Sequence, residues 1–121
     1  TPFYPFYENV LPNAVLAKAI RDNAGKVALR IDEQISGRRG SAASTDFGNV
    51  SQVIPAFEMR YAVSEEPVAS HSIDMCKTAA TDTAFNNAIA VAKVLALTAC
   101  DLLADSGLLE QTRTDFAQRI G

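Results

Sequence analysis

Three stretches of the chain carry apolar residues at helical spacing. In the first, over residues 13–23, Asn13 can cap the start and one face carries Val15, Leu16, Ala19 and Ile20. The second runs from about 81 to 104 and can be capped by Thr81 or Asp82. It is so rich in apolar residues that we expect most of its circumference to be covered. The third, after residues 105–107, predicts a closing amphipathic helix.

Residues 52–63 mostly alternate in the manner of a strand, and Pro55 marks a break or an edge near its start. Residues 26–35 are ambiguous, because an alternating run is interrupted by Asp32 and Glu33. The proline- and aromatic-rich residues 1–7 predict an extended arm that packs onto something, and residues 36–46 and 64–75 predict polar loops. These elements predict an α/β fold, with helices packed on a small mixed sheet, in a single domain over residues 1–121.

Composition narrows the class of protein. The 121 residues are enough for one modest domain, and 48% hydrophobic with 21% charged residues is typical of a soluble globular chain. The net charge of −3 argues against nucleic acid as a partner. The longest apolar run, residues 88–103, is interrupted by Lys93 and Asp101, so we expect no membrane span.

The two cysteines, Cys76 and Cys100, form no CxxC pair. We expect them to be reduced core residues of a cytoplasmic protein, with a single disulfide as the alternative. The chain begins at Thr1, without Met and without a signal-peptide pattern. This start is the one expected of a chain that lacks its true N-terminus or was cut from a larger protein.

Candidate chemistry is sparse. The single histidine, His71, could be a general base or a metal ligand, or an ordinary surface residue. No HExxH or HxD pairing accompanies it, and a catalytic zinc usually needs three protein ligands. The loop around residues 44–51 gathers hydrogen-bonding side chains near Gly48, which either bind a ligand or satisfy a turn: Ser44, Thr45, Asp46, Asn49 and Ser51.

The sequence STDFGNVS at 44–51, followed by VIP at 53–55, resembles a hallmark of zinc aminoacylase/carboxypeptidase amidohydrolases similar to p-aminobenzoyl-glutamate hydrolase and its dipeptidase relatives. His71-Ser72 stands where that family has a His-Thr pair after a strand. Residues 90–99 resemble its long C-terminal helix, and residues 101–116 its closing helix. The resemblance covers nearly the whole chain, with one departure: Phe57-Glu58 stands where relatives often carry a histidine.

The resemblance implies the C-terminal part of a zinc-exopeptidase catalytic domain, which cleaves amide bonds of acyl amino acids or dipeptides. The family holds two zinc ions or a related divalent pair, and His71 is the one ligand with a counterpart here. The HxD motif, the catalytic Glu-Glu pair, the N-terminal half and the lid domain have no counterpart. We therefore expect no zinc bound by this chain alone, and no hydrolysis by the family mechanism without the missing half.

Two further hypotheses stay open. The chain could be a naturally short, metal-free protein, such as a small-molecule binder, cyclase or isomerase, that works as a homodimer. Asp46, Glu58 and His71 would then be its acid/base residues, and Ser44, Thr45 and Asn49 would bind substrate. It could also be a noncatalytic interaction module. A naturally short half-domain would expose a sheet edge and the apolar face of its long helix, so under the first of these hypotheses we expect a homodimer or a heteromer.

Overall fold

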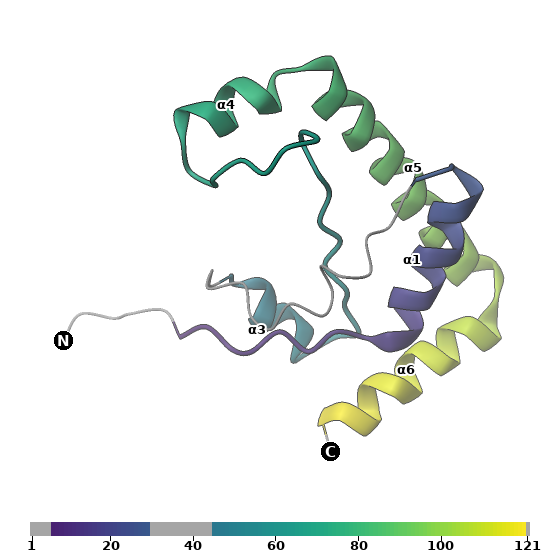
Figure 1. The fold of residues 1–121 in the computed structure, drawn as a ribbon. Helices are drawn as coiled ribbons and strands as arrows, with labels where there is room; N and C mark the ends of the chain where they lie inside the picture. Colours follow the sequence, from purple (N-terminus) through teal and green to yellow (C-terminus); the bar gives the residue numbers. More distant parts are fainter. Residues whose placement is uncertain (1–5, 30–44, 121) are drawn as a thin grey trace.

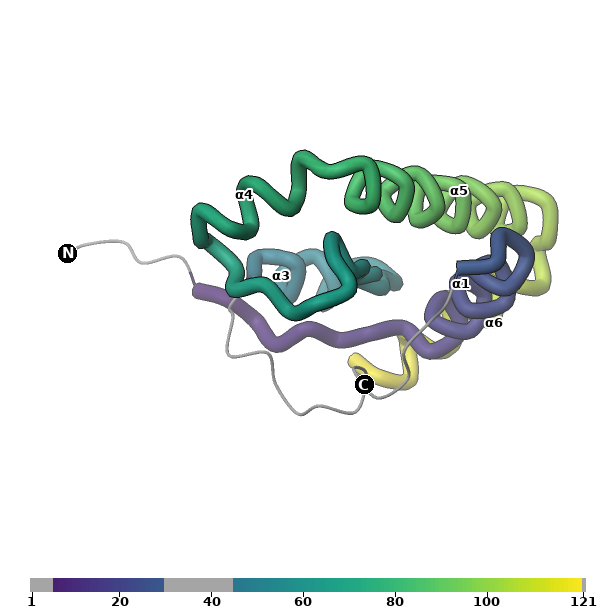
Figure 2. The backbone as a smooth tube through the Cα atoms, turned by 45° about the horizontal axis from the view of Figure 1, so that its top comes forward, coloured from purple at the N-terminus to yellow at the C-terminus, as the bar shows by residue number. Residues whose placement is uncertain are grey.

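The computed structural model describes residues 6–29 and 45–120, and within these it is helical (Figure 1). The helices, in order, are α1 (Ala14–Lys26), α3 (Phe47–Ser51), α4 (Ile73–Ala79), α5 (Asp82–Ala104) and α6 (Ser106–Ile120). Helices α1, α5 and α6 pack on one another, and α4 contacts α5. Figure 2 shows α1 and α6 together on one side of α5. The predicted single domain therefore has its packed part in three helices.

The caps explain where the long helices begin. Asn13 Oδ1 accepts a hydrogen bond from Leu16 N at 3.0 Å, and Thr81 Oγ1 accepts from Ala84 N at 3.2 Å. Asp105 Oδ1 accepts from Gly107 N at 2.8 Å at the start of α6. Each side chain satisfies amides that a helix N-terminus leaves without an intrahelical partner. The three predicted helices are confirmed, and α1 runs to Lys26, three residues beyond the predicted end.

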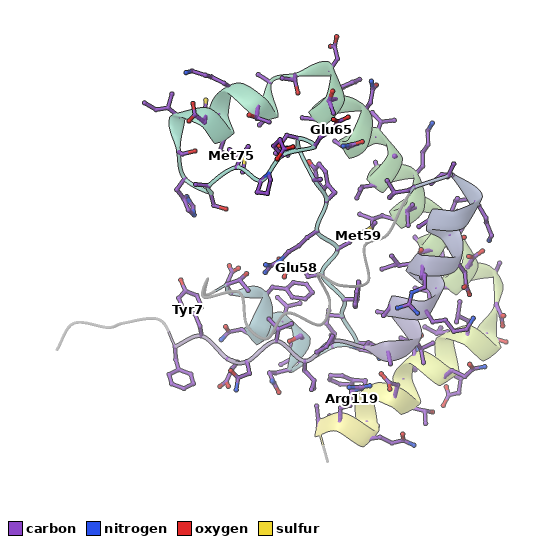
Figure 3. The ribbon with its side chains drawn as sticks, in the orientation of Figure 1. Tyr7, Glu58, Met59, Glu65, Met75 and Arg119 are labelled. Carbon is purple, nitrogen blue, oxygen red and sulfur yellow. The ribbon has the colours of Figure 1, made fainter. Side chains whose placement is uncertain are left out.

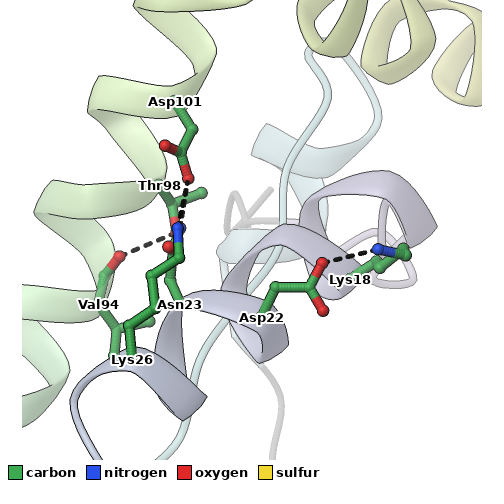
Figure 4. A network of polar contacts seen from close by, with 7 residues as sticks. All are labelled: Lys18, Asp22, Asn23, Lys26, Val94, Thr98 and Asp101. Carbon is green, nitrogen blue, oxygen red and sulfur yellow. Dashed lines mark hydrogen bonds and ion pairs between the residues drawn. The ribbon is translucent and has the colours of Figure 1, made fainter.

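The core is small and lies where α1 crosses α5. Ile20, Ala24 and Val94 form a buried cluster, against which four partly buried side chains pack: Val27, Leu29, Phe57 and Met59. Asn23 Nδ2 adds hydrogen bonds across the same contact, to Thr98 Oγ1 at 3.1 Å and to Asp101 Oδ2 at 2.8 Å (Figure 4). The α1–α5 contact is therefore stabilised both by buried apolar side chains and by hydrogen bonds from Asn23.

The prediction of a mixed sheet is wrong, because the described residues contain no strand. Residues 52–54 form a turn after α3, and residues 55–62 are irregular. Alternation holds over four residues only: Phe57 and Met59 pack on the core, while Glu58 and Arg60 are exposed and pair with each other at 3.2 Å. Ile54 and Tyr61, which the strand prediction placed among its apolar positions, are exposed, and Ala56 is buried. A strand needs a neighbouring strand to accept its backbone hydrogen bonds, and this segment has none in the described structure.

Three smaller predictions are also corrected. The described residues leave most of α5 uncovered, since its buried positions are Ala84, Val91, Val94 and Thr98. Both cysteines are exposed free thiols instead of core residues. The loop predicted over 64–75 gives way at residue 73 to the short helix α4, which Ser72 caps. By length and composition α5 could cross a membrane, a test that core helices of soluble proteins also pass.

Candidate functional site

The candidate residues lie on separate segments. Thr45 and Asp46 precede α3, and Asn49 lies within it. Glu58 follows on the irregular segment, and His71 precedes α4. Ser44 lies outside the described residues. Figure 3 shows Glu58 on the segment that leads from α3 toward Glu65.

Helix α3 holds the N-terminal arm through its polar side chains. Asn49 Nδ2 donates to Phe6 O at 3.0 Å, and Gln52 Nε2 donates to Asn9 O at 2.8 Å. Ser51 Oγ, fully buried, accepts from Leu11 N at 2.9 Å and donates to Gly48 O at 2.8 Å. Of the arm predicted over residues 1–7, only Phe6 and Tyr7 are described. The Phe6 carbonyl is bonded to Asn49, but both aromatic side chains are exposed, at 77% and 49% of their full accessible area, so packing of the aromatic arm is not confirmed. The bond to Phe6 O gives Asn49 a structural partner; its predicted role in substrate binding stays a prediction.

Gly48 is required by this contact. A Cβ atom at position 48 would lie 1.8 Å from Glu8 O, which is inside any permitted contact distance. The arm therefore crosses α3 at a distance that a side chain would forbid. The glycine of the STDFGNVS sequence has a packing role, whatever its role in chemistry.

Asp46 presents an exposed carboxylate directly before α3 and makes no side-chain cap hydrogen bond. The neighbouring Thr45 Oγ1 accepts from Phe47 N at 3.2 Å, so the local turn is satisfied by threonine. The Asp46 carboxylate is thus left available to a ligand, and Glu58 is engaged by Arg60.

His71 occupies a constrained backbone position. Its φ of 58° lies in the left-handed region that disfavours residues with a Cβ atom. Ser72 fixes the turn on its other side, since its Oγ donates to Ala69 O at 2.7 Å and accepts from Met75 N at 3.0 Å. The imidazole is exposed, so it is accessible to a metal ion or a partner.

The structure does not bring these groups into one site. Helices α3 and α4, which follow Asp46 and His71, do not pack on each other. Within residues 6–29 and 45–120 no three His, Cys, Asp or Glu side chains form a group that could hold a metal ion. Since a catalytic zinc needs about three protein ligands, the described residues do not make a complete zinc site.

Two open grooves, of about 530 and 520 Å³, lie against α6 on the other side of the molecule. The first is shared with α1 and α5 and contains the Lys18–Asp22 ion pair, at 2.6 Å. The hydrogen bond from Lys18 holds the pKa of the exposed Asp22 carboxyl below its ordinary value. Neither groove is lined by a candidate residue, and neither has converging groups that suggest chemistry.

The sequence patterns did not predict the hydrogen bonds that join α1 to α6. Asn13 Nδ2 donates to Thr112 O at 2.9 Å, and Asp115 Oδ2 accepts from Ala14 N at 2.8 Å. Both Asn13 and Thr112 are buried. Asn13 was identifiable as a cap, but its second bond depends on a residue 99 positions away and has no local signal.

Comparison with known proteins agrees with the resemblance to dipeptidases noted in the sequence. No model of a known protein family matches this chain. The chain is 33% identical to human Xaa-Arg dipeptidase over 114 residues, and 32% identical to the mouse protein over 110 residues. These matches cover 94% and 91% of this chain but 26% and 25% of the relatives. The chain therefore spans about a quarter of the length of the curated relatives that it matches.

Proposed function

We propose that this chain forms the C-terminal part of the catalytic region of a zinc-dependent peptidase or amidohydrolase that cleaves amide bonds of dipeptides or acyl amino acids. The observation that carries the proposal is the similarity to Xaa-Arg dipeptidase along 94% of the chain. By that name, dipeptides ending in arginine are the first substrate class to test. The rest of the active site would come from polypeptide outside this chain.

His71 is the residue that we assign to the metal. Its imidazole is exposed, and Ser72 fixes the backbone on which it stands. A zinc ion lowers the pKa of bound water and polarises the amide carbonyl, which is the chemistry that amide hydrolysis needs. One imidazole does not bind zinc strongly enough for this, so His71 would be one ligand among several.

The alternatives receive less support. A metal-free acid/base catalyst needs its acid and base to converge on one substrate. Asp46 and His71 stand before helices that do not pack together, and Glu58 is paired with Arg60. A noncatalytic interaction module is consistent with the exposed surface, but it gives no reason for the similarity to a dipeptidase.

The test uses a protein in which this chain replaces the matching segment of human Xaa-Arg dipeptidase, hereafter the joined protein. We expect zinc-dependent hydrolysis of an Xaa-Arg dipeptide, lowered roughly a hundredfold or more in kcat/KM by His71→Ala. Lys77→Ala, on the exposed side of α4, is the matched control and should leave the rate unchanged. A folded joined protein whose activity ignores His71→Ala contradicts the assignment. Chelator-sensitive hydrolysis by the isolated chain, abolished by His71→Ala, contradicts the claim that its site is incomplete.

A further inference from the structure

Helix α5 carries a second apolar face that packs on nothing in the described structure. We call it the outer stripe, and its members follow one another at spacings of four and three residues: Phe85, Ile89, Ala92, Ala96, Ala99 and Leu103. All six are exposed, with Phe85 at 63% and Leu103 at 89% of their full accessible area. Alternating steps of four and three keep side chains on one helical face.

The buried positions of α5 lie on the opposite face: Ala84, Val91, Val94 and Thr98. Val94 and Thr98 on this face contact α1. Between the two apolar faces lies a narrow polar edge that includes Asn86 and Lys93. A helix that is apolar around most of its circumference is typical of one buried from two sides. The described structure supplies the covering on one side only.

Exposed apolar side chains on other parts of the described chain point the same way. Val53 and Ile54, which follow α3, and Ile73 of α4 are exposed at 72%, 52% and 76% of their full accessible area. Large apolar side chains exposed on more than one segment indicate a partner that contacts the chain on more than one side.

We propose that the outer stripe is the surface on which the remainder of a longer, dipeptidase-like protein packs. This inference rests on the proposed function, because the occupant is the part of such a protein that this chain lacks. About three quarters of the length of human Xaa-Arg dipeptidase lies outside the match. A body of that size, joined through the backbone, can present a complementary apolar face to α5.

A second copy of the chain is a poorer fit. The stripe spans about two and a half heptads, fewer than the three or four that a coiled coil sustains, and three of its six members are alanines that bury little area. A two-fold interface would also leave the other exposed apolar residues uncovered. A bilayer fits poorly as well, since Lys93 lies at the middle of α5 and a charged side chain is strongly disfavoured at the centre of a membrane span.

The test measures burial, so it does not depend on catalysis. Ala96→Cys is introduced into the joined protein and into the isolated chain, with Cys76 and Cys100 replaced by serine. Lys93→Cys, one turn away on the polar edge, is the matched control. We expect maleimide to label both positions rapidly in the isolated chain. In the joined protein, labelling at 96 should slow by about a hundredfold or more relative to 93, because a buried thiol reacts only through local opening.

Equal labelling at 96 and 93 in a folded joined protein overturns the proposal. A joined protein that protects position 96 but hydrolyses nothing supports the interface and refutes the proposed function. A joined protein that hydrolyses the dipeptide but does not protect position 96 refutes the proposed interface and leaves the proposed function standing.

A second measurement uses the isolated chain and decides the matter if the joined protein does not fold. Sedimentation is run on the chain and on its Ala96→Glu variant. A discrete dimer that Ala96→Glu dissociates identifies a second copy as the occupant and overturns the proposal. If phosphatidylcholine vesicles protect the thiol of the Ala96→Cys variant from labelling, the occupant of the outer stripe is a bilayer, and the proposal is also overturned. A monomer, or a polydisperse association that Ala96→Glu suppresses, without protection by vesicles, supports an occupant outside this chain.

Discussion

Gly48 shows at the scale of one residue how the arm is held. A Cβ atom added at this position would lie 1.8 Å from Glu8 O, so Gly48→Ala must displace the backbone of the arm or of α3. We expect the free energy of unfolding to fall by about 1–3 kcal/mol in urea denaturation, the usual cost of overpacking. The arm should also become susceptible to proteolysis, because its hydrogen bonds to Asn49 and Ser51 would be lost.

Gly25→Ala is the control for that experiment. Gly25 also lies in a helix, near the end of α1, and a Cβ there meets nothing within 4 Å. Alanine favours the helix by up to about 1 kcal/mol over glycine, so this variant should be neutral or more stable. Equal effects at 25 and 48 would show that the contact between the arm and α3 does not form.

The residues of the STDFGNVS sequence also show what sequence reasoning could and could not supply. The motif alone predicts either a turn or a ligand site. In the structure Thr45 satisfies the turn, while Asn49 and Ser51 bind backbone atoms of residues 6–11. Those partners lie about 40 positions earlier in the chain, and no local pattern encodes a contact at that separation. His71 stands out because it is the single histidine, but its positive φ has no signal in the sequence.

At the scale of elements, α1, α5 and α6 were predictable because their caps and spacing are local. Asn13, Thr81 and Asp105 each bond an amide two or three residues ahead. Whether residues 52–63 form a strand could not be predicted in the same way. Alternation indicates which side chains lie on the same side of the segment, but it does not show whether a neighbouring strand is present to accept its backbone hydrogen bonds. Helix α4 was missed because its seven residues follow a polar segment and none of them is buried.

Asn13 gives the prediction at this scale, since it both caps α1 and links α1 to α6. Asn13→Ala removes the bond to Leu16 N and the interhelical bond that Asn13 donates to Thr112 O, a carbonyl inside α6. We expect a loss of about 2 kcal/mol in the free energy of unfolding, from about 1 for the cap and about 1 for the hydrogen bond between the helices. Thr81→Ala, at the cap of α5, should lose only the first of these.

Asn13→Ser separates the two contributions. Serine keeps an oxygen that can accept from the helix amide, but it is too short to replace the bond to Thr112 O. Its loss should therefore fall between wild type and Asn13→Ala. If Asn13→Ala costs no more than Thr81→Ala, the link to α6 contributes nothing, and the packing of α1 on α6 must rest on apolar contacts.

At the scale of the whole molecule, the described residues leave large apolar side chains exposed on several segments, among them Ile54 after α3, Ile73 of α4, and Phe85 and Leu103 of α5. This exposure sets how the isolated chain should respond to a hydrophobic probe.

The isolated chain should bind a hydrophobic dye in its native state, and Ala96→Glu should lower that binding, since it places a charge in the outer stripe. Dye fluorescence gives the result, measured on a chain whose helix content is checked by circular dichroism at 222 nm. A folded chain that binds no dye would have to close over its own apolar surface. The outer stripe of α5 would then be covered within the chain, with no remainder of a longer protein needed.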